Sequence, residues 1–85
     1  MNTEKYTLGL KDKNGIELPN ECVIHGSLAG QTDKHYFNLF LNEEEGSVEM
    51  IACTYGYVHN VTLEDLINFE FVGLTKDNLH LLECD

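Results

Sequence analysis

Apolar and polar residues alternate along much of the chain, and residues that favour turns interrupt the alternation at short intervals. Tyr6, Leu8 and Leu10 alternate with small or polar neighbours, which is the period-two pattern of a strand with one buried face. The motif DKNG at residues 12–15 follows, and Asn-Gly favours a tight hairpin because both residues tolerate positive φ. The spacing therefore predicts short antiparallel strands joined by hairpins.

The same pattern predicts several further strands. A return strand beginning at Ile16 is expected to break or bulge at Pro19, which cannot donate a ladder hydrogen bond. Residues 50–53 are apolar on both faces, which is typical of a central strand covered on each side. The other predicted strands cover residues 22–28, 36–41, 57–61 and 69–75.

One short helix is predicted near residues 62–68. The motif TLED at residues 62–65 resembles a capping box, with Asp in place of the usual Glu. Leu63, Leu66 and Ile67 then have the i, i+3, i+4 spacing of a helix of about two turns. A KDN turn is expected to start a final hairpin that returns through residues 78–84, a segment that is also compatible with a short helix.

These elements predict a single domain spanning residues 1–85. The expected fold class is α+β, mainly β: a small twisted antiparallel or barrel-like sheet of about five to seven short strands with one short helix. The hydrophobic fraction of 42% is ordinary for a globular chain.

The charge is strongly acidic and unevenly distributed. Residues 1–42 contain four Lys and five acids, a net of −1, whereas residues 43–85 contain one Lys and ten acids, a net of −9. The chain has no arginine. Such a surface repels phosphate, so we predict no direct binding to nucleic acid or to an anionic membrane, and attraction to basic proteins instead. The net charge of −10 also opposes close packing of many copies, which favours a monomer or a homodimer.

The three cysteines, Cys22, Cys53 and Cys84, cannot all pair within one chain. The chain starts without an apolar stretch of the signal-peptide type, and no apolar run approaches the ~20 residues of a membrane span. We therefore expect a cytoplasmic protein with free thiols.

A zinc site is the strongest metal hypothesis that the sequence offers. Cys22 and His25 have a C-x2-H spacing, and His80 and Cys84 have the spacing of a second ligand pair. Residues three apart on a strand point to opposite faces, however, and 22–28 is predicted to be a strand. We therefore predict no metal and no cofactor, and the zinc domain stays as the less favoured alternative.

Catalytic residues are not predicted. The two serines, Ser27 and Ser47, lie outside any nucleophile-elbow motif, and Cys53 follows apolar neighbours, which raise the pKa of a thiol. No glycine-rich loop precedes the predicted helix. We therefore predict that the protein is not an enzyme.

Acidic and aromatic residues supply the candidate binding site. Three consecutive glutamates at a predicted hairpin tip repel one another and have no structural explanation from the sequence, and two tyrosines flank a glycine in TYGYVHN. On a strand both tyrosine rings are expected to share a face. The predicted partner-binding residues are Glu43, Glu44, Glu45, Glu49, Tyr55, Tyr57, Glu64 and Asp65.

These features favour a small acidic binding protein that occupies a basic surface of a nucleic-acid-handling partner. A phage-type inhibitor of a host enzyme or defence system fits this description, with carboxylates in the place of phosphates. An immunity protein that neutralises a basic toxin and a homo-oligomeric structural or accessory protein are the alternatives.

Overall fold

The strands form one five-stranded antiparallel sheet and one separate hairpin. The computed structural model describes residues 7–28, 30–53 and 55–82. The hairpin pairs β1 (Thr7–Lys11) with β2 (Glu17–Pro19). The larger sheet has the order β6-β5-β4-β3-β7, and its strands are β3 (Cys22–Gly26), β4 (His35–Asn42), β5 (Ser47–Ala52), β6 (Gly56–Val58) and β7 (Phe69–Leu74). The predicted fold, mainly β with antiparallel strands, is therefore confirmed.

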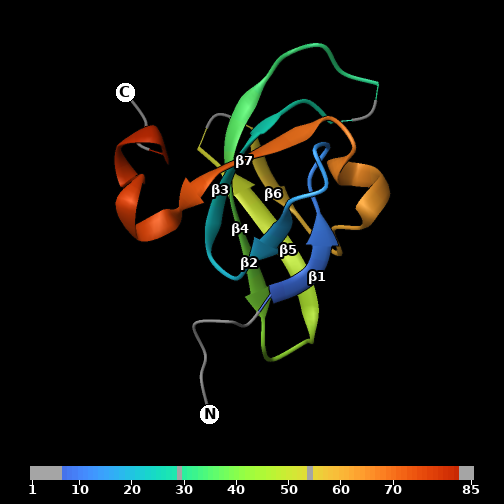
Figure 1. Ribbon diagram of the computed structural model, residues 1–85, viewed down its shortest axis with the longest axis vertical. Coiled ribbons are helices and arrows are strands. Elements are labelled where there is room, and N and C mark those ends of the chain that lie inside the picture. The colour runs from blue at the N-terminus through green and yellow to red at the C-terminus, as the bar shows by residue number, and fades with distance from the viewer. Residues whose placement is uncertain (1–6, 29, 54, 83–85) are drawn as a thin grey trace.

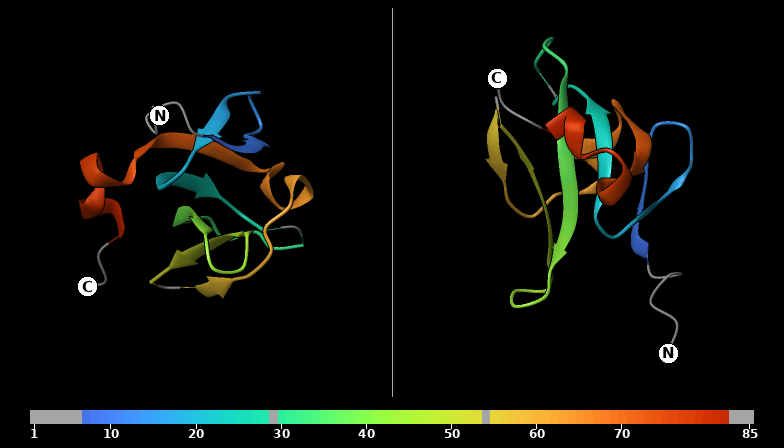
Figure 2. Two further views of the ribbon diagram at one scale, coloured as in Figure 1. Left: turned by 90° about the horizontal axis from the view of Figure 1, so that it is seen from below. Right: turned by 90° about the vertical axis from the view of Figure 1, so that its left-hand side faces the viewer.

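The larger sheet curls so that its two edges lie on different sides of the molecule. Seen from below, β5 and β6 lie on one side and β7 on the other, with the β1–β2 hairpin beside β7 (Figures 1 and 2). The described residues also form three short 3₁₀ helices: η2 (Leu63–Leu66), η3 (Thr75–Asp77) and η4 (Leu79–Leu82). The η2 turn packs against β1, η3 packs against β3, and η4 packs against β4.

The inner face of the curled sheet carries the core. Ile24, Phe37 and Met50 are fully buried there, as the period-two pattern predicts for alternate residues of a strand. The ring of Phe37 meets the ring of Phe69 edge to face, with a centroid distance of 5.5 Å. The β1–β2 hairpin closes the core with the fully buried Leu18.

A buried carboxylate attaches this hairpin to the larger sheet. Asp12 accepts hydrogen bonds from the backbone N–H groups of Asn14, Ile16 and Phe71, each at 2.8 Å. Burial alone would raise the pKa of Asp12, but these hydrogen bonds, together with the charge of Lys13, hold the pKa below its usual value. Because Phe71 lies on β7, the contact also covers part of that edge strand.

Two local predictions near the C-terminus need correction. The short helix is present at Leu63–Leu66, but it is a single 3₁₀ turn and not two turns of α-helix. Residues 75–82 form η3 and η4, so the expected final hairpin is wrong, and the helical alternative is correct over Leu79–Leu82. Alternation over so few residues does not distinguish a strand from a 3₁₀ turn.

The position predicted for residues 50–53 is also only partly correct. β5 has a neighbouring strand on each side, yet Ile51 is exposed on the outer face. The central strand of the sheet is β4, not β5. The apolar run therefore indicated a paired strand but not one that is covered on both faces.

Candidate functional site

The acidic run forms the turn between β4 and β5. Asn42 organises this turn: its side-chain oxygen accepts the backbone N–H groups of Glu44 at 3.1 Å and Glu45 at 3.4 Å. The backbone N–H of Gly46 donates to the carbonyl of Asn42 at 2.7 Å, and Gly46 has a φ of 69°, which favours glycine. Glu43, Glu44 and Glu45 are all exposed. The turn therefore presents three carboxylates on a backbone held by side-chain hydrogen bonds.

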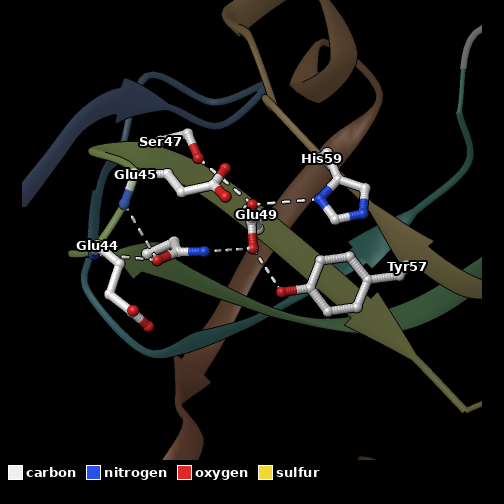
Figure 3. A network of polar contacts seen from close by, with 7 residues as sticks. Glu44, Glu45, Ser47, Glu49, Tyr57 and His59 are labelled. Carbon is white, nitrogen blue, oxygen red and sulfur yellow. Dashed lines mark hydrogen bonds and ion pairs between the residues drawn. The ribbon is translucent and has the colours of Figure 1, made fainter.

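The fourth glutamate of this hairpin has a different environment. Glu49 lies on the outer face of β5, opposite Phe40, but only 1% of its surface is exposed. Its carboxylate contacts the side chains of Asn42, Ser47, Tyr57 and His59, and the last three are labelled in Figure 3.

Each of these side chains contacts a carboxylate oxygen of Glu49. The hydroxyl of Tyr57 and the amide of Asn42 donate to Oε1, the latter at 3.3 Å. The hydroxyl of Ser47 donates to Oε2 at 3.3 Å, and Nδ1 of His59 lies 3.2 Å from the same oxygen. Because the buried charge has its hydrogen-bonding capacity filled by neighbouring donors, Glu49 is a structural acid and not a surface charge.

The network shifts the pKa of both Glu49 and Tyr57. The hydrogen bond from Tyr57 is the main reason that the pKa of Glu49 lies below its usual value; burial opposes the shift, and His59 and Asn42 add to it. The same hydrogen bond, burial, and the charges of Glu49 and Glu45 raise the pKa of Tyr57. The influence of Glu45 on the Tyr57 hydroxyl indicates that the acidic turn and this tyrosine belong to one electrostatic environment.

Two aromatic rings border the network. The rings of Tyr57 and His59 are partly stacked on one another, with centroids 4.4 Å apart and planes inclined by 30°, and both are labelled in Figure 3. Tyr57 is 44% exposed, and the side chain of His59 is 66% exposed. Phe40 meets Tyr57 edge to face at 6.3 Å. The hairpin end of the sheet thus combines an acidic turn with an exposed pair of rings.

The structure brings together five of the eight predicted site residues. Glu43, Glu44 and Glu45 lie on the turn, Glu49 follows on β5, and the side chain of Tyr57 reaches Glu49 from β6.

Tyr55 lies elsewhere. It packs its ring against Phe37 of the inner face at 5.5 Å and accepts a hydrogen bond from the side-chain amide of Gln31. The expectation that Tyr55 and Tyr57 share a face is therefore wrong, because Tyr55 precedes the strand, where the period-two rule does not apply.

Glu64 and Asp65 are also separate from the acidic turn, since both belong to η2, which packs against β1. The carboxylate of Asp65 accepts hydrogen bonds from the backbone N–H of Thr62 at 2.9 Å and from its hydroxyl at 3.1 Å. Asp65 therefore caps its own turn, as the capping-box motif predicts, and of this pair only Glu64 is exposed.

The candidate zinc ligands do not converge within the described residues. Cys22 is buried in the core, and burial raises the pKa of its thiol to about 12. His25 lies on the outer face of the same strand, where its ring stacks on Tyr36 at 4.2 Å. His80 is exposed on η4, and Cys84 lies outside the described residues.

Cys53 directly follows β5 and is disulfide-bonded, so the expectation of free thiols is wrong for this residue. Disulfides are typical of oxidising compartments and are rare in cytosolic proteins.

No helix within residues 7–28, 30–53 and 55–82 has the length and apolar character needed to cross a bilayer.

The predicted site lacked three of the four residues whose side chains contact the carboxylate of Glu49. Asn42, Ser47 and His59 are ordinary polar residues in the sequence, and the only available signal was the alternation that places Ser47 and Glu49 on one face of β5. The burial of that face depends on side chains from the following strand and loop, which the local pattern does not reveal.

No protein-family model, curated protein or solved structure matches this chain. The fold and the site define a small antiparallel β protein with an acidic turn, a buried and hydrogen-bonded glutamate and an exposed ring pair.

Proposed function

We propose that this is a small acidic binding protein that occupies a basic surface of a nucleic-acid-handling partner, as an inhibitor would. The observation that carries the proposal is the contrast within one hairpin. Glu49 is buried and its carboxylate is hydrogen-bonded to neighbouring side chains, whereas Glu43, Glu44 and Glu45 are exposed on a turn held by Asn42. Three carboxylates on an ordered turn meet a positive surface at a smaller entropic cost than carboxylates on a flexible segment.

Electrostatics would govern how this protein finds its partner. A net charge of −10 on 85 residues attracts basic surfaces over a range set by the ionic strength, and so accelerates association at low salt. A partner that binds phosphates already has the lysine and arginine side chains that the exposed carboxylates would contact. A basic toxin neutralised by an immunity protein would satisfy the same physical requirement. The proposal includes no catalytic residue, and it places the protein in the cytoplasm as a monomer or homodimer.

The test begins with capture of the partner from the native host and continues with association kinetics. The variant Glu43→Gln/Glu44→Gln/Glu45→Gln removes the three charges of the turn. A matched control, Glu17→Gln/Asp33→Asn/Glu70→Gln, removes three exposed charges outside this hairpin and gives the same net charge.

The proposal predicts that the turn variant associates at least about tenfold more slowly at low salt and that its rate depends less on salt. The control variant should show a clearly smaller change. Equal effects of the two variants would assign the attraction to net charge alone and reject a role for the turn. Association rates that change neither with salt concentration nor with the mutations would reject the electrostatic mechanism.

A further inference from the structure

The exposed ring pair beside the acidic turn has a geometry that selects one kind of cation. We infer that Tyr57 and His59 form a stacking surface for an arginine side chain of the partner. The inference rests on the proposed function, because it specifies the chemistry of the basic surface. It goes beyond that function in requiring a guanidinium group and not positive charge in general.

The buried carboxylate of Glu49 holds both rings of the pair in place. The Tyr57 hydroxyl donates to the buried carboxylate of Glu49, and Nδ1 of His59 contacts the other oxygen of the same carboxylate. Phe40 supports Tyr57 through an edge-to-face contact. Two exposed rings that are each fixed by a buried group lose little conformational entropy when a ligand stacks on them.

The surroundings of the rings favour a cation. Asn42 connects the turn to the network, because its oxygen accepts the backbone N–H groups of Glu44 and Glu45 while its amide donates to Glu49. The carboxylates of Glu43, Glu44 and Glu45 are exposed on this turn. The oxygens of Glu49 already contact four side chains, so the exposed carboxylates that a ligand can reach are those of the turn. A cation resting on the rings would therefore lie close to unpaired carboxylate charge.

A guanidinium group should bind to such a site more tightly than an ammonium group does. It is planar and weakly hydrated, so it stacks on an aromatic face while its N–H groups reach carboxylates at the side. The ammonium group of lysine is a compact and strongly hydrated point charge. The carboxylates of the turn attract both side chains, whereas the ring pair should discriminate between them.

The experiment compares octaarginine with octalysine as probes of equal charge. Their affinities are measured by titration calorimetry at physiological and at low salt, with the wild-type protein and with Tyr57→Leu, His59→Ala, Tyr57→Phe and the triple Gln variant of the turn. Tyr55→Leu is the matched control, because Tyr55 is a partly exposed tyrosine that packs on the opposite face. Thermal unfolding establishes that each variant is folded.

The wild-type protein should bind octaarginine about two- to fivefold more tightly than octalysine, which corresponds to one exposed cation–π contact. Tyr57→Leu and His59→Ala should reduce this preference, because they should weaken octaarginine binding more than octalysine binding. Tyr57→Phe keeps the ring and should keep most of the preference, and Tyr55→Leu should keep all of it. The triple Gln variant should reduce the affinities for both peptides by the same factor.

Different outcomes overturn the two proposals separately. Equal affinities for the two peptides, or a preference that survives both ring variants, would overturn the arginine inference and leave the electrostatic function intact. Octalysine binding that is unaffected by the triple Gln variant would overturn the role of the acidic turn. If Tyr57→Leu fails to fold, the same comparison with His59→Ala, whose side chain is largely exposed, decides the inference.

Discussion

The hydroxyl of Tyr57 on β6 donates a hydrogen bond to the carboxylate of Glu49, which is buried on the adjacent strand β5. Because of this contact, Glu49 stabilises the fold and is not exposed like the three glutamates of the turn. It also orients a tyrosine beside the three acids that remain exposed. The resulting pKa shift of Glu49 makes the contribution of this network to stability depend on pH.

The network predicts a loss of stability in acid. The pKa of Glu49 in the folded protein lies below its unfolded value of about 4.3, so its contribution is present above that pH and is lost as the pH falls through the folded pKa. Glu49→Gln does not titrate, and its amide can still accept from Tyr57 while donating to Ser47 and His59.

The melting temperature of the wild type should therefore decline more steeply than that of Glu49→Gln between about pH 5 and pH 2. Part of the decline should persist in the variant, because the pKa of Asp12 is also depressed. Thermal unfolding of both proteins across this pH range is the measurement. Parallel curves would show that Glu49 keeps an ordinary pKa.

Gly26 cannot be replaced by alanine without local displacement. A Cβ atom at this position would lie 2.2 Å from the backbone oxygen of Asn68 and 2.8 Å from Cα of Phe69. Gly26→Ala should therefore destabilise the protein by about 2 kcal/mol, as overpacking of a close backbone contact does. Urea unfolding provides the free energy.

Gly73→Ala is the control for that measurement. Its Cβ would meet the side-chain nitrogen of Asn78 at 2.5 Å, and a side chain can move away where a backbone cannot. The cost should be limited to about 1 kcal/mol, for the hydrogen bond from Asn78 to the carbonyl of Leu74. A larger loss for Gly73→Ala than for Gly26→Ala would contradict the packing assigned to β3 and β7.

Glu21 adopts a left-handed conformation that a glutamate disfavours. Its φ is 60°, in a connection held by the hydrogen bond from the backbone N–H of Thr75 to its carbonyl. Glu21→Gly should stabilise the protein by about 0.5–1 kcal/mol, because relief of the left-handed strain exceeds the added flexibility of the unfolded chain. Glu17→Gly, within β2, should instead destabilise it by a similar amount. Chemical denaturation of the two variants should give opposite signs.

The thiol of Cys22 should be unreactive in the folded protein. Burial excludes reagents and raises the pKa to about 12, so the thiolate is nearly absent at neutral pH. Alkylation by iodoacetamide should therefore proceed only at the rate at which the protein opens, and urea should accelerate it strongly. Rapid labelling of Cys22 under native conditions, identified by peptide mapping, would place this residue outside the core.

The strand pattern of this protein could be predicted from local sequence. The alternation around Ile24, Phe37 and Leu39 corresponds to their common burial, because side chains in a strand alternate between faces whatever the partner strand is. The DKNG turn and the Thr62–Asp65 capping contact also depend on residues that are close in the chain. The geometry of a hairpin turn or a helix cap is determined by a few neighbouring residues, so it can be predicted from the sequence alone.

Only the tertiary structure decided which acids are available to a partner. Glu49 resembles Glu43, Glu44 and Glu45 in the sequence, but Tyr57 and His59 cover it and contact its carboxylate from the next strand and loop. Tyr55 and Tyr57 likewise look equivalent, yet their rings pack against opposite faces of β4. Burial and charge at these positions depend on side chains that arrive from neighbouring strands, and the pairing of strands is a property of the whole chain.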